Sequence, residues 1–258
     1  MHDLAPELFG ARKERVHLFP ELSSTMDTAR RLAVQGCADG TVVIAARQTG
    51  GRGRLDRKWI SGPGGLYFTL VLRPRIPAEQ AWKVLFCAGA GLCEALMEKC
   101  GVPARVKWPN DILVSGRKLS GMLTEMTLDG DRVKYLNLGV GVNVANDPGE
   151  ERAISLLDLT GKVFSRSMIL TAFLDDLEPR LAALGDTPVL PRWKALCGTI
   201  GQMVSIQTLR GSFEGTAVDV AEDGSLVVQT AGGEVRVSCG DCFHRAAGEG
   251  PPEIREER

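Results

Sequence analysis

The chain has 258 residues, of which 44% are hydrophobic and 24% are charged, values ordinary for a globular protein with one large domain or a medium domain plus a small one. Its 31 basic and 32 acidic side chains give a formal net charge of -1. That balance excludes a globally basic binder of nucleic acid or acidic membranes, so no DNA or membrane partner is expected and anion binding must come from local clusters.

The N-terminal residues and the cysteines indicate the compartment. Residues 1–15 mix acids, bases and Pro6 without the apolar core of a signal peptide, and no stretch reaches the roughly 18 apolar residues of a membrane helix. Seven scattered cysteines do not suggest a disulfide framework. We therefore expect a cytoplasmic protein with reduced thiols. Cys239, Cys242 and His244 lack a fourth ligand, so no zinc site is predicted.

Strands and helices interleave along the first three quarters of the chain. Apolar and β-branched runs predict strands at residues 16–22, 41–46, 66–72, 104–107, 112–114, 118–127 and 133–144. Apolar residues at helical spacing predict helices at residues 26–35, 78–100, 168–184 and 191–197. Because strands and helices do not alternate strictly, an α+β layer is favoured over a doubly wound parallel sheet.

The pattern changes after Gly198. Short strands are predicted at residues 203–208, 212–220, 225–230 and 234–238, with glycine turns between them. Regular short strands of this kind indicate a small β-barrel. We expect one domain over residues 1–197, a barrel over 198–247, and a disordered polar tail over 248–258.

A glycine-rich basic loop over residues 48–59 is the first candidate site. Arg52, Arg54, Arg57 and Lys58 fall within seven positions, next to three glycines. Glycines let a backbone approach a ligand closely, and guanidinium groups suit carboxylate and phosphate oxygens. The pattern favours an anion site; the alternative is a solvated basic hairpin.

Three further motifs have both a functional and a structural interpretation. Asn110 and Asp111 of a Lys-Trp-Pro-Asn-Asp segment could orient a nucleotide or help to hold Mg²⁺, or form an ordinary turn. Lys118 could point into a cleft, or protect an edge strand. Small residues before Asn143 permit a flat ligand to approach, or relieve packing. No dinucleotide-type glycine motif and no Walker-type loop occurs.

Taken in order, these motifs resemble those of the biotin–protein ligase family over roughly residues 16–247. The series is Ser24-Thr25, Gln48, Gly51-Arg52-Gly53-Arg54, Arg57-Lys58-Trp59, Lys107-Trp108-Pro109-Asn110-Asp111, Lys118-Leu119-Ser120-Gly121 and Gly141-Val142-Asn143. The resemblance implies a mixed central sheet flanked by helices, of the class II synthetase/biotin ligase type, with a small C-terminal SH3-like barrel. It also implies that biotin and MgATP give biotinyl-5′-AMP, from which biotin passes to a lysine of a biotin carboxyl carrier protein.

The same resemblance implies roles for individual residues of the 1–197 domain. Biotin contacts are expected from Ser24, Thr25, Gln48, Gly51, Arg52, Lys118 and Gly121. ATP contacts are expected from Arg54, Arg57, Trp59, Lys107, Asn110 and Asn143. Catalysis is expected from Lys118, Arg52, Arg54 and Asp111, because cations must offset two anions that meet, while Asp111 lies near Mg²⁺ or the acceptor lysine. Met26 departs from the pattern, since some members of the family have asparagine there.

Other functions and partners remain as alternatives. A lipoate or octanoate ligase has a similar fold, but the arginine-rich loop favours biotin. A non-catalytic biotin-binding module would not need Lys118, Arg52 and Arg54 together. Some family members carry an N-terminal helix-turn-helix domain and act as repressors; fifteen residues before the first strand cannot form one, so the short form is expected. An edge strand at 133–144 could pair with a second subunit, giving a homodimer, or with the acceptor.

Overall fold

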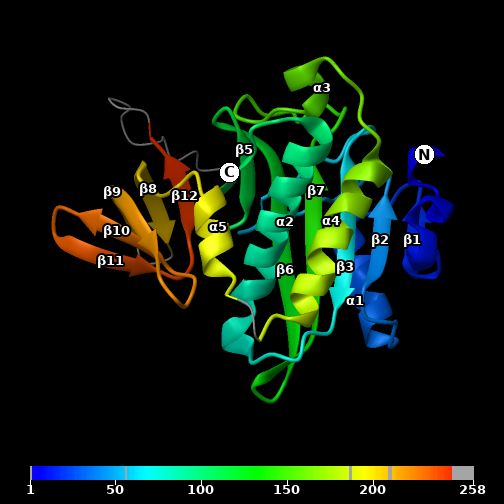
Figure 1. The fold of residues 1–258 in the computed structure, drawn as a ribbon, viewed down its shortest axis with the longest axis horizontal. Coiled ribbons are helices and arrows are strands. Elements are labelled where there is room, and N and C mark those ends of the chain that lie inside the picture. The colour runs from blue at the N-terminus through cyan, green and yellow to red at the C-terminus, as the bar shows by residue number, and fades with distance from the viewer. Residues whose placement is uncertain (1, 56, 186–187, 209–210, 246–258) are drawn as a thin grey trace.

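A seven-stranded mixed sheet forms the centre of the computed structural model, which describes residues 2–55, 57–185, 188–208 and 211–245 (Figure 1). Its order is β1-β2-β3-β7-β6-β5-β4. The strands are β1 (Val16–Phe19), β2 (Thr41–Ala45), β3 (Leu66–Leu72), β4 (Arg105–Lys107), β5 (Asp111–Val114), β6 (Arg117–Asp129) and β7 (Arg132–Val142). Only the β1–β2 pair is parallel among these, so the expectation of an α+β fold on a mixed sheet is confirmed.

Helices cover the two faces of this sheet unequally. The long helices α2 (Trp82–Cys100) and α4 (Arg166–Ala182) cross one face, as Figure 1 shows. The shorter α1 (Thr25–Val34) packs on the other face, against β2, β3 and β7. Strand β3 is buried at every position, because both of its faces are covered. Beyond α1, the second face carries glycines in β6 and β7, which leaves room for a ligand.

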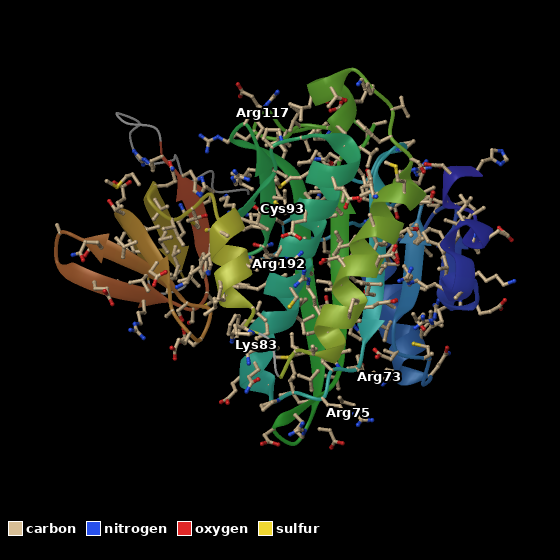
Figure 2. The ribbon with its side chains drawn as sticks, in the orientation of Figure 1. Arg73, Arg75, Lys83, Cys93, Arg117 and Arg192 are labelled. Atoms are coloured by element: carbon tan, nitrogen blue, oxygen red, sulfur yellow. The ribbon has the colours of Figure 1, made fainter. Side chains whose placement is uncertain are left out.

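Short elements complete the N-terminal part. The 3₁₀ helices η1 (His2–Leu4) and η2 (Pro6–Arg15) precede β1, and Leu4 and Phe9 anchor them in the core. Helix α5 (Leu190–Leu196) lies between α2 and the C-terminal sheet. Its Arg192 pairs with Glu94 of α2 and, at 3.0 Å, with Asp176 of α4 (Figure 2). These ion pairs fasten α5 to the helical layer.

The C-terminal strands form a second, antiparallel sheet in the order β11-β10-β9-β8-β12. They are β8 (Met203–Thr208), β9 (Gly211–Val220), β10 (Leu226–Thr230), β11 (Gly233–Val237) and β12 (Asp241–His244). Strands β11 and β12 end the order and do not pair with each other in the described residues. The expected SH3-like barrel is therefore not confirmed, whereas the small all-β unit is.

Three local expectations need correction. The strand predicted at 133–144 is not an edge: β7 lies between β3 and β6, so it cannot pair with another chain. The helix predicted from residue 78 begins at Trp82, after the 3₁₀ turn η3 (Ala78–Gln80). Helix α3 (Leu156–Thr160) was missed, although Ser155 and Asp158 form a capping box that marks its start. The predicted tail at 248–258 lies outside the described residues.

The cysteines are all free thiols. Burial raises the pKa of Cys93, which lies on α2 in Figure 2, and that of Cys242 to about 12. Within the described ranges, no three His, Cys, Asp or Glu side chains are grouped so as to hold a metal ion. No helix in that part of the chain is long and apolar enough to cross a membrane.

Candidate active site

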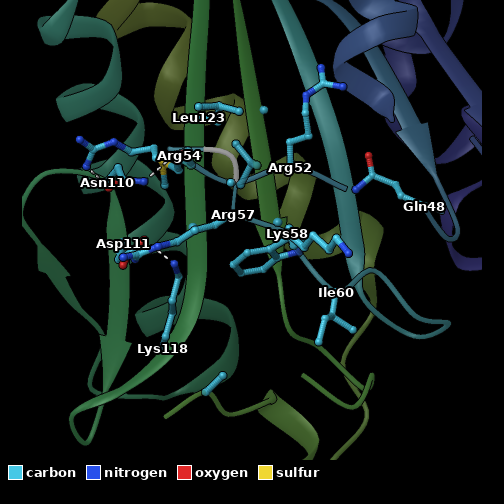
Figure 3. A pocket seen from close by; sticks show the side chains of 18 of the residues that line it. Gln48, Arg52, Arg54, Arg57, Lys58, Ile60, Asn110, Asp111, Lys118 and Leu123 are labelled. Carbon is cyan, nitrogen blue, oxygen red and sulfur yellow. Dashed lines mark hydrogen bonds and ion pairs between the residues drawn. The ribbon is translucent and has the colours of Figure 1, made fainter. Parts of the chain in front are cut away.

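A pocket on the α1 side of the large sheet gathers nearly all the residues that the sequence motifs indicated (Figure 3). Gly51 and Lys107 are the two predicted residues that do not line it. Those that do are Ser24, Thr25, Gln48, Arg52, Arg54, Arg57, Trp59, Asn110, Asp111, Lys118, Gly121 and Asn143. They come from α1, the 48–59 loop, β5, β6 and the end of β7, which places segments distant in sequence around one cavity.

Gly51 and Lys107 lie next to the pocket and contact residues that line it. The carbonyl oxygen of Gly51 accepts a hydrogen bond of 2.9 Å from Trp59 N. A Cβ atom at position 51 would lie 2.4 Å from Trp59 O, so glycine permits this close approach. Lys107 Nζ lies 3.8 Å from Asp111 Oδ2 and 5.8 Å from the ring centre of Phe243. Lys107 can therefore act on the pocket through Asp111.

One end of the pocket is polar and held by a chain of hydrogen bonds. The Oε1 atom of Gln48 accepts from Thr25 N at 2.8 Å and from Thr25 Oγ1 at 3.1 Å, and its Nε2 atom donates to Ser61 Oγ at 2.9 Å. Thr69 Oγ1 donates to Thr25 Oγ1 at 2.8 Å, while Ser24 caps α1. The bonds fix the orientation of the Gln48 amide. No motif marked Ser61 or Thr69.

The floor of the pocket consists of glycines under a tryptophan. Gly121 of β6 and Gly141 of β7 are cross-strand partners. A Cβ atom on Gly141 would lie 2.4 Å from Trp59 Nε1, so the indole occupies the space of the missing side chain. A Cβ atom on Gly139 would lie 2.7 Å from Met26 Sδ. Trp59 Nε1 is buried without a hydrogen-bond partner in the described part of the chain. A buried donor of this kind indicates that a ligand acceptor belongs beside it.

Cations and the carboxylate of Asp111 gather at the other end. Lys118 Nζ lies 2.8 Å from Asp111 Oδ1 and 5.3 Å from the ring centre of Trp59. Arg54 donates from Nη1 to Asn110 Oδ1 at 3.1 Å, as Figure 3 shows. Asn110 Nδ2 in turn donates to the carbonyl of Met122 at 2.7 Å. Gln48 lies on the opposite side of the pocket from Lys118, so the cavity has one neutral polar end and one cationic end.

The C-terminal sheet contributes to this cationic end, which the motifs did not predict. Arg54 Nη2 donates to the carbonyl of Gly240 at 3.1 Å. Arg57 Nη2 lies 2.6 Å from Asp241 Oδ2, and its guanidinium lies 5.6 Å from the Phe243 ring centre. Asp241 itself lines the pocket. Arg54 and Arg57 of the loop are thus held by strand β12 and the turn before it.

A second set of contacts joins the C-terminal sheet to the segment around Trp108. The Trp108 indole N–H donates to the carbonyl of Gly224 at 3.0 Å, and its backbone N–H donates to Thr199 Oγ1 at 3.0 Å. That hydroxyl also lies 3.0 Å from His244 Nε2. Burial, with a smaller contribution from the nearby Lys107, lowers the pKa of His244 to about 4. The Trp108–Pro109 peptide bond is cis.

Comparisons with known proteins agree with this architecture. The biotin/lipoate A/B protein ligase family model matches residues 18–143, and the biotin protein ligase C terminal domain model matches residues 199–245. The bifunctional ligase/repressor BirA of Bacillus subtilis is 34% identical over 230 residues, covering 85% of this chain and 71% of its own. The biotin--[acetyl-CoA-carboxylase] ligase of Paracoccus denitrificans is 31% identical, covering 85% and 96%.

A comparison with solved structures also finds a biotin protein ligase. The biotin protein ligase from Aquifex aeolicus in complex with biotin and ATP superposes with a TM-score of 0.75 at 30% identity, covering 89% of this chain and 98% of that one. The chain belongs to the biotin/lipoate A/B protein ligase family and, within it, to the biotin–protein ligases.

Proposed function

We propose that the protein activates biotin with ATP to biotinyl-5′-AMP and transfers biotin to a lysine of a biotin carboxyl carrier protein domain. The observation that carries this proposal is one pocket with a neutral polar end at Thr25 and Gln48 and a cationic end at Arg54 and Lys118. A ligand with a polar ring at one end and a carboxylate at the other matches that arrangement. The relatives, which are named as biotin ligases, support the same assignment.

The polar end recognises the ureido ring of biotin. That ring carries two N–H donors and one carbonyl acceptor, each of which needs a partner when it is buried. Ser24 and Thr25 supply hydroxyl groups, and Gln48 supplies an amide. Gly51 lets the loop lie close above the bound vitamin, and Gly121 lets its chain run along the sheet. Met26 contributes a thioether rather than an amide at this end, so it adds packing and no hydrogen bond.

The cationic end brings two anions together. The carboxylate of biotin must attack the α-phosphate of ATP, and the repulsion between them is the main electrostatic barrier. Lys118, Arg52 and Arg54 offset this charge, and Lys118 is the residue on which we expect catalysis to depend most. Positioning and charge stabilisation suffice for phosphoryl chemistry of this type without a strong base.

The nucleotide lies on the side of the C-terminal sheet. We assign its contacts to Arg54, Arg57, Trp59, Asn110 and Asn143, with Lys107 acting through Asp111. The position of the Trp59 indole over the glycine floor supports this assignment, because it presents an aromatic ring in the pocket lining. Asn143 Oδ1 accepts from Asn146 Nδ2 at 3.0 Å, so its amide N–H₂ is oriented toward other partners.

Mg²⁺ fits beside Asp111. The ion is usually held by one or two carboxylates together with substrate phosphates, and its remaining ligands are water. Asp111 supplies one such carboxylate at the cationic end, where the phosphates would lie. When bound, the ion neutralises phosphate charge. Asp111 pairs with Lys118 at 2.8 Å, so the same carboxylate also orients this lysine. In the second half-reaction, we expect Asp111 to assist deprotonation of the acceptor amine.

The domain organisation and assembly are also proposals. The two family models lie on either side of Gly198, which supports a catalytic domain over 1–197 and a C-terminal domain over 198–247. The strand order of the second sheet suits an SH3-like barrel that is open between β11 and β12. A homodimer formed by extending the large sheet would use β1 or β4, because these strands are its edges.

Pyrophosphate exchange tests the function. We expect exchange between ATP and pyrophosphate to require biotin and Mg²⁺, and Lys118→Ala to reduce its rate by a factor of about 100 or more. Lys134→Ala is the matched control, because Lys134 is an exposed lysine of β7 outside the pocket. Exchange with lipoate instead of biotin would identify the lipoate or octanoate ligase. Tight biotin binding without exchange would identify a non-catalytic binding module.

A further inference from the structure

We propose that Asp27 is a positioning residue of this enzyme, which holds Arg52 at the rim of the pocket so that the glycine-arginine loop stays closed over biotin and its adenylate. Asp27 does not line the pocket, whereas Arg52 does. Its effect on the reaction is therefore exerted through Arg52. The inference rests on the proposed function and adds to it a residue that none of the sequence motifs contained.

The geometry of the pair is bidentate. Arg52 Nη1 donates to Asp27 Oδ2 at 2.9 Å, and Arg52 Nη2 donates to Asp27 Oδ1 at 2.8 Å. Glu125 of β6 adds a carboxylate oxygen 3.5 Å from Arg52 Nη2. Arg30 bonds Glu125 and lies 3.9 Å from Asp27. The hydrogen bonds from Arg52 lower the pKa of Asp27, so the carboxylate stays charged at neutral pH.

In α1, Asp27 does not make the helix-capping hydrogen bond that an acid at its position commonly makes. Asp27 stands three residues after the N-cap Ser24, the position from which an acid can bond back to the cap N–H. In α3 of the same molecule, Asp158 makes this bond to Ser155. In α1 both carboxylate oxygens bond Arg52 instead. Helix α1 therefore lacks the acid-to-cap hydrogen bond of a capping box, and the Asp27 carboxylate bonds the loop arginine instead.

The loop needs such an anchor. It carries glycines on both sides of Arg52. Its first residues are tied to the segment before α1 by the backbone bonds from Thr49 N to Leu22 O and from Gly50 N to Ser23 O, whereas the bonds from Trp59 N to Gly51 O and from Gly53 N to Arg57 O stay within the loop. An arginine side chain loses rotamer entropy when it is fixed. Fixing it before the ligand arrives removes that cost from binding. The Nε–H edge of Arg52 has no partner in the described residues, so it remains available to a substrate anion.

The charges in this cluster balance. Two carboxylates face two guanidinium groups, and their side chains are between 31% and 50% exposed. Although the cluster as a whole is neutral, the oriented Arg52 still presents its Nε–H edge to the biotin carboxylate. An exposed ion pair of this kind contributes little to global stability. Loss of Asp27 should therefore affect ligand retention more than folding.

The test is Asp27→Asn in the full chain, which keeps the size of the side chain and removes its charge. We expect the KM for biotin in pyrophosphate exchange to rise about fivefold, the scale of one exposed ion pair, while kcat changes by less than about twofold. We also expect more biotinyl-5′-AMP to appear free in solution, measured by filtration after a single turnover. Asp27→Glu should restore part of both effects, since it keeps the carboxylate.

Two controls make the result specific. Glu21→Gln removes a comparably exposed pair, with Arg47 at 2.9 Å, outside the pocket lining, and should leave KM and adenylate release unchanged. In an Arg52→Gln background, Asp27→Asn should have no additional effect. Unchanged KM and release in Asp27→Asn, or an equal effect in both backgrounds, would overturn the proposal. Absence of biotin-dependent exchange in the unmodified protein would instead overturn the function itself.

Discussion

Gly141 and Gly121 show how single residues shape this site. They face each other across β7 and β6, and Trp59 fills the space above them. Glycine inside a strand weakens it, because it offers no side chain to pack and loses more backbone entropy on folding. Here the missing side chains leave a trough along the sheet. The glycines lower the intrinsic stability of β6 and β7 at these positions, and they allow the Trp59 ring to lie directly on the strand backbone.

Gly141→Ala should remove this trough. The added Cβ would lie 2.4 Å from Trp59 Cε2 and Nε1, so the indole must move. Overpacking of this kind costs roughly 1–3 kcal/mol, and we expect biotin-dependent exchange to fall at least about tenfold, the effect of losing one good contact in the transition state. Urea denaturation and exchange assays measure the two effects. Gly62→Ala, where nothing lies within 4 Å of the added atom, should match the unmodified protein. Normal activity in Gly141→Ala would contradict this account.

Strand β12 is the element that joins the two sheets functionally. It pairs antiparallel with β8. Its Asp241 lines the pocket, the ring of Phe243 lies under the cations of Arg57 and Lys107, and His244 bonds Thr199. Its His244 is kept neutral by burial. A buried neutral histidine makes the attachment of the element dependent on pH.

The sign of this dependence follows from the direction of the pKa shift. The pKa of His244 is about 4 in the folded protein and 6.5 in an ordinary environment, so the unfolded chain binds more protons between these values. The free energy of unfolding should therefore fall as pH drops from about 6.5 to about 4, and this group should cause no further loss below pH 4. His244→Gln should flatten that part of the profile in urea denaturation at pH 7, 5.5 and 4. Parallel profiles for both proteins would refute the assignment.

At the scale of the whole molecule, the pocket lies where the two sheets meet. The large sheet supplies its floor, and the C-terminal sheet supplies partners for Arg54 and Arg57. Trp108 and Thr199 connect the same two parts through buried bonds. A ligand in this pocket should therefore stabilise both parts of the molecule and not the catalytic domain alone.

Hydrogen exchange can measure this coupling. With biotin and ATP each at about 100 times its Kd, each ligand should stabilise the folded state by about 2.7 kcal/mol. We expect slower amide exchange at residues 51–59 and also at residues 240–244, because both segments close the cationic end. Protection confined to residues before 198 would show that the sheets respond independently.

Much of this architecture could be predicted from the sequence, because it rests on local patterns. The largely apolar run at residues 66–72 predicted a strand, and the structure confirms it as β3. The motifs around Arg52, Asn110 and Lys118 were recognisable as a set, and the fold brings them to one pocket. Each of these motifs is recognisable in the sequence because it forms a single turn or the end of one strand, so its residues are close together in the chain.

The remaining features depend on contacts between distant segments. Arg54 bonds a carbonyl 186 positions away, and a backbone acceptor leaves no residue signature. Asp27 was missed because its partner lies 25 positions away in a loop. The placement of β7 as an edge was wrong, since strand order is set by pairing across the sheet and not by the pattern of one strand. The small all-β unit after residue 198 was predicted, and the SH3-like barrel stays a prediction.

The bonds from Arg54 to Gly240 and from Arg57 to Asp241 also set the order in which the site is completed during synthesis. Translation delivers a chain from its N-terminus, and domains tend to fold as they emerge. The strands of the large sheet, its glycine floor and Lys118 all precede residues 240 and 241 in the chain. Arg52 and the bond from Arg54 to Asn110 depend only on earlier segments, whereas the bonds to Gly240 and Asp241 can form only after the C-terminal sheet has been made. The last strand made is the one that completes the active site.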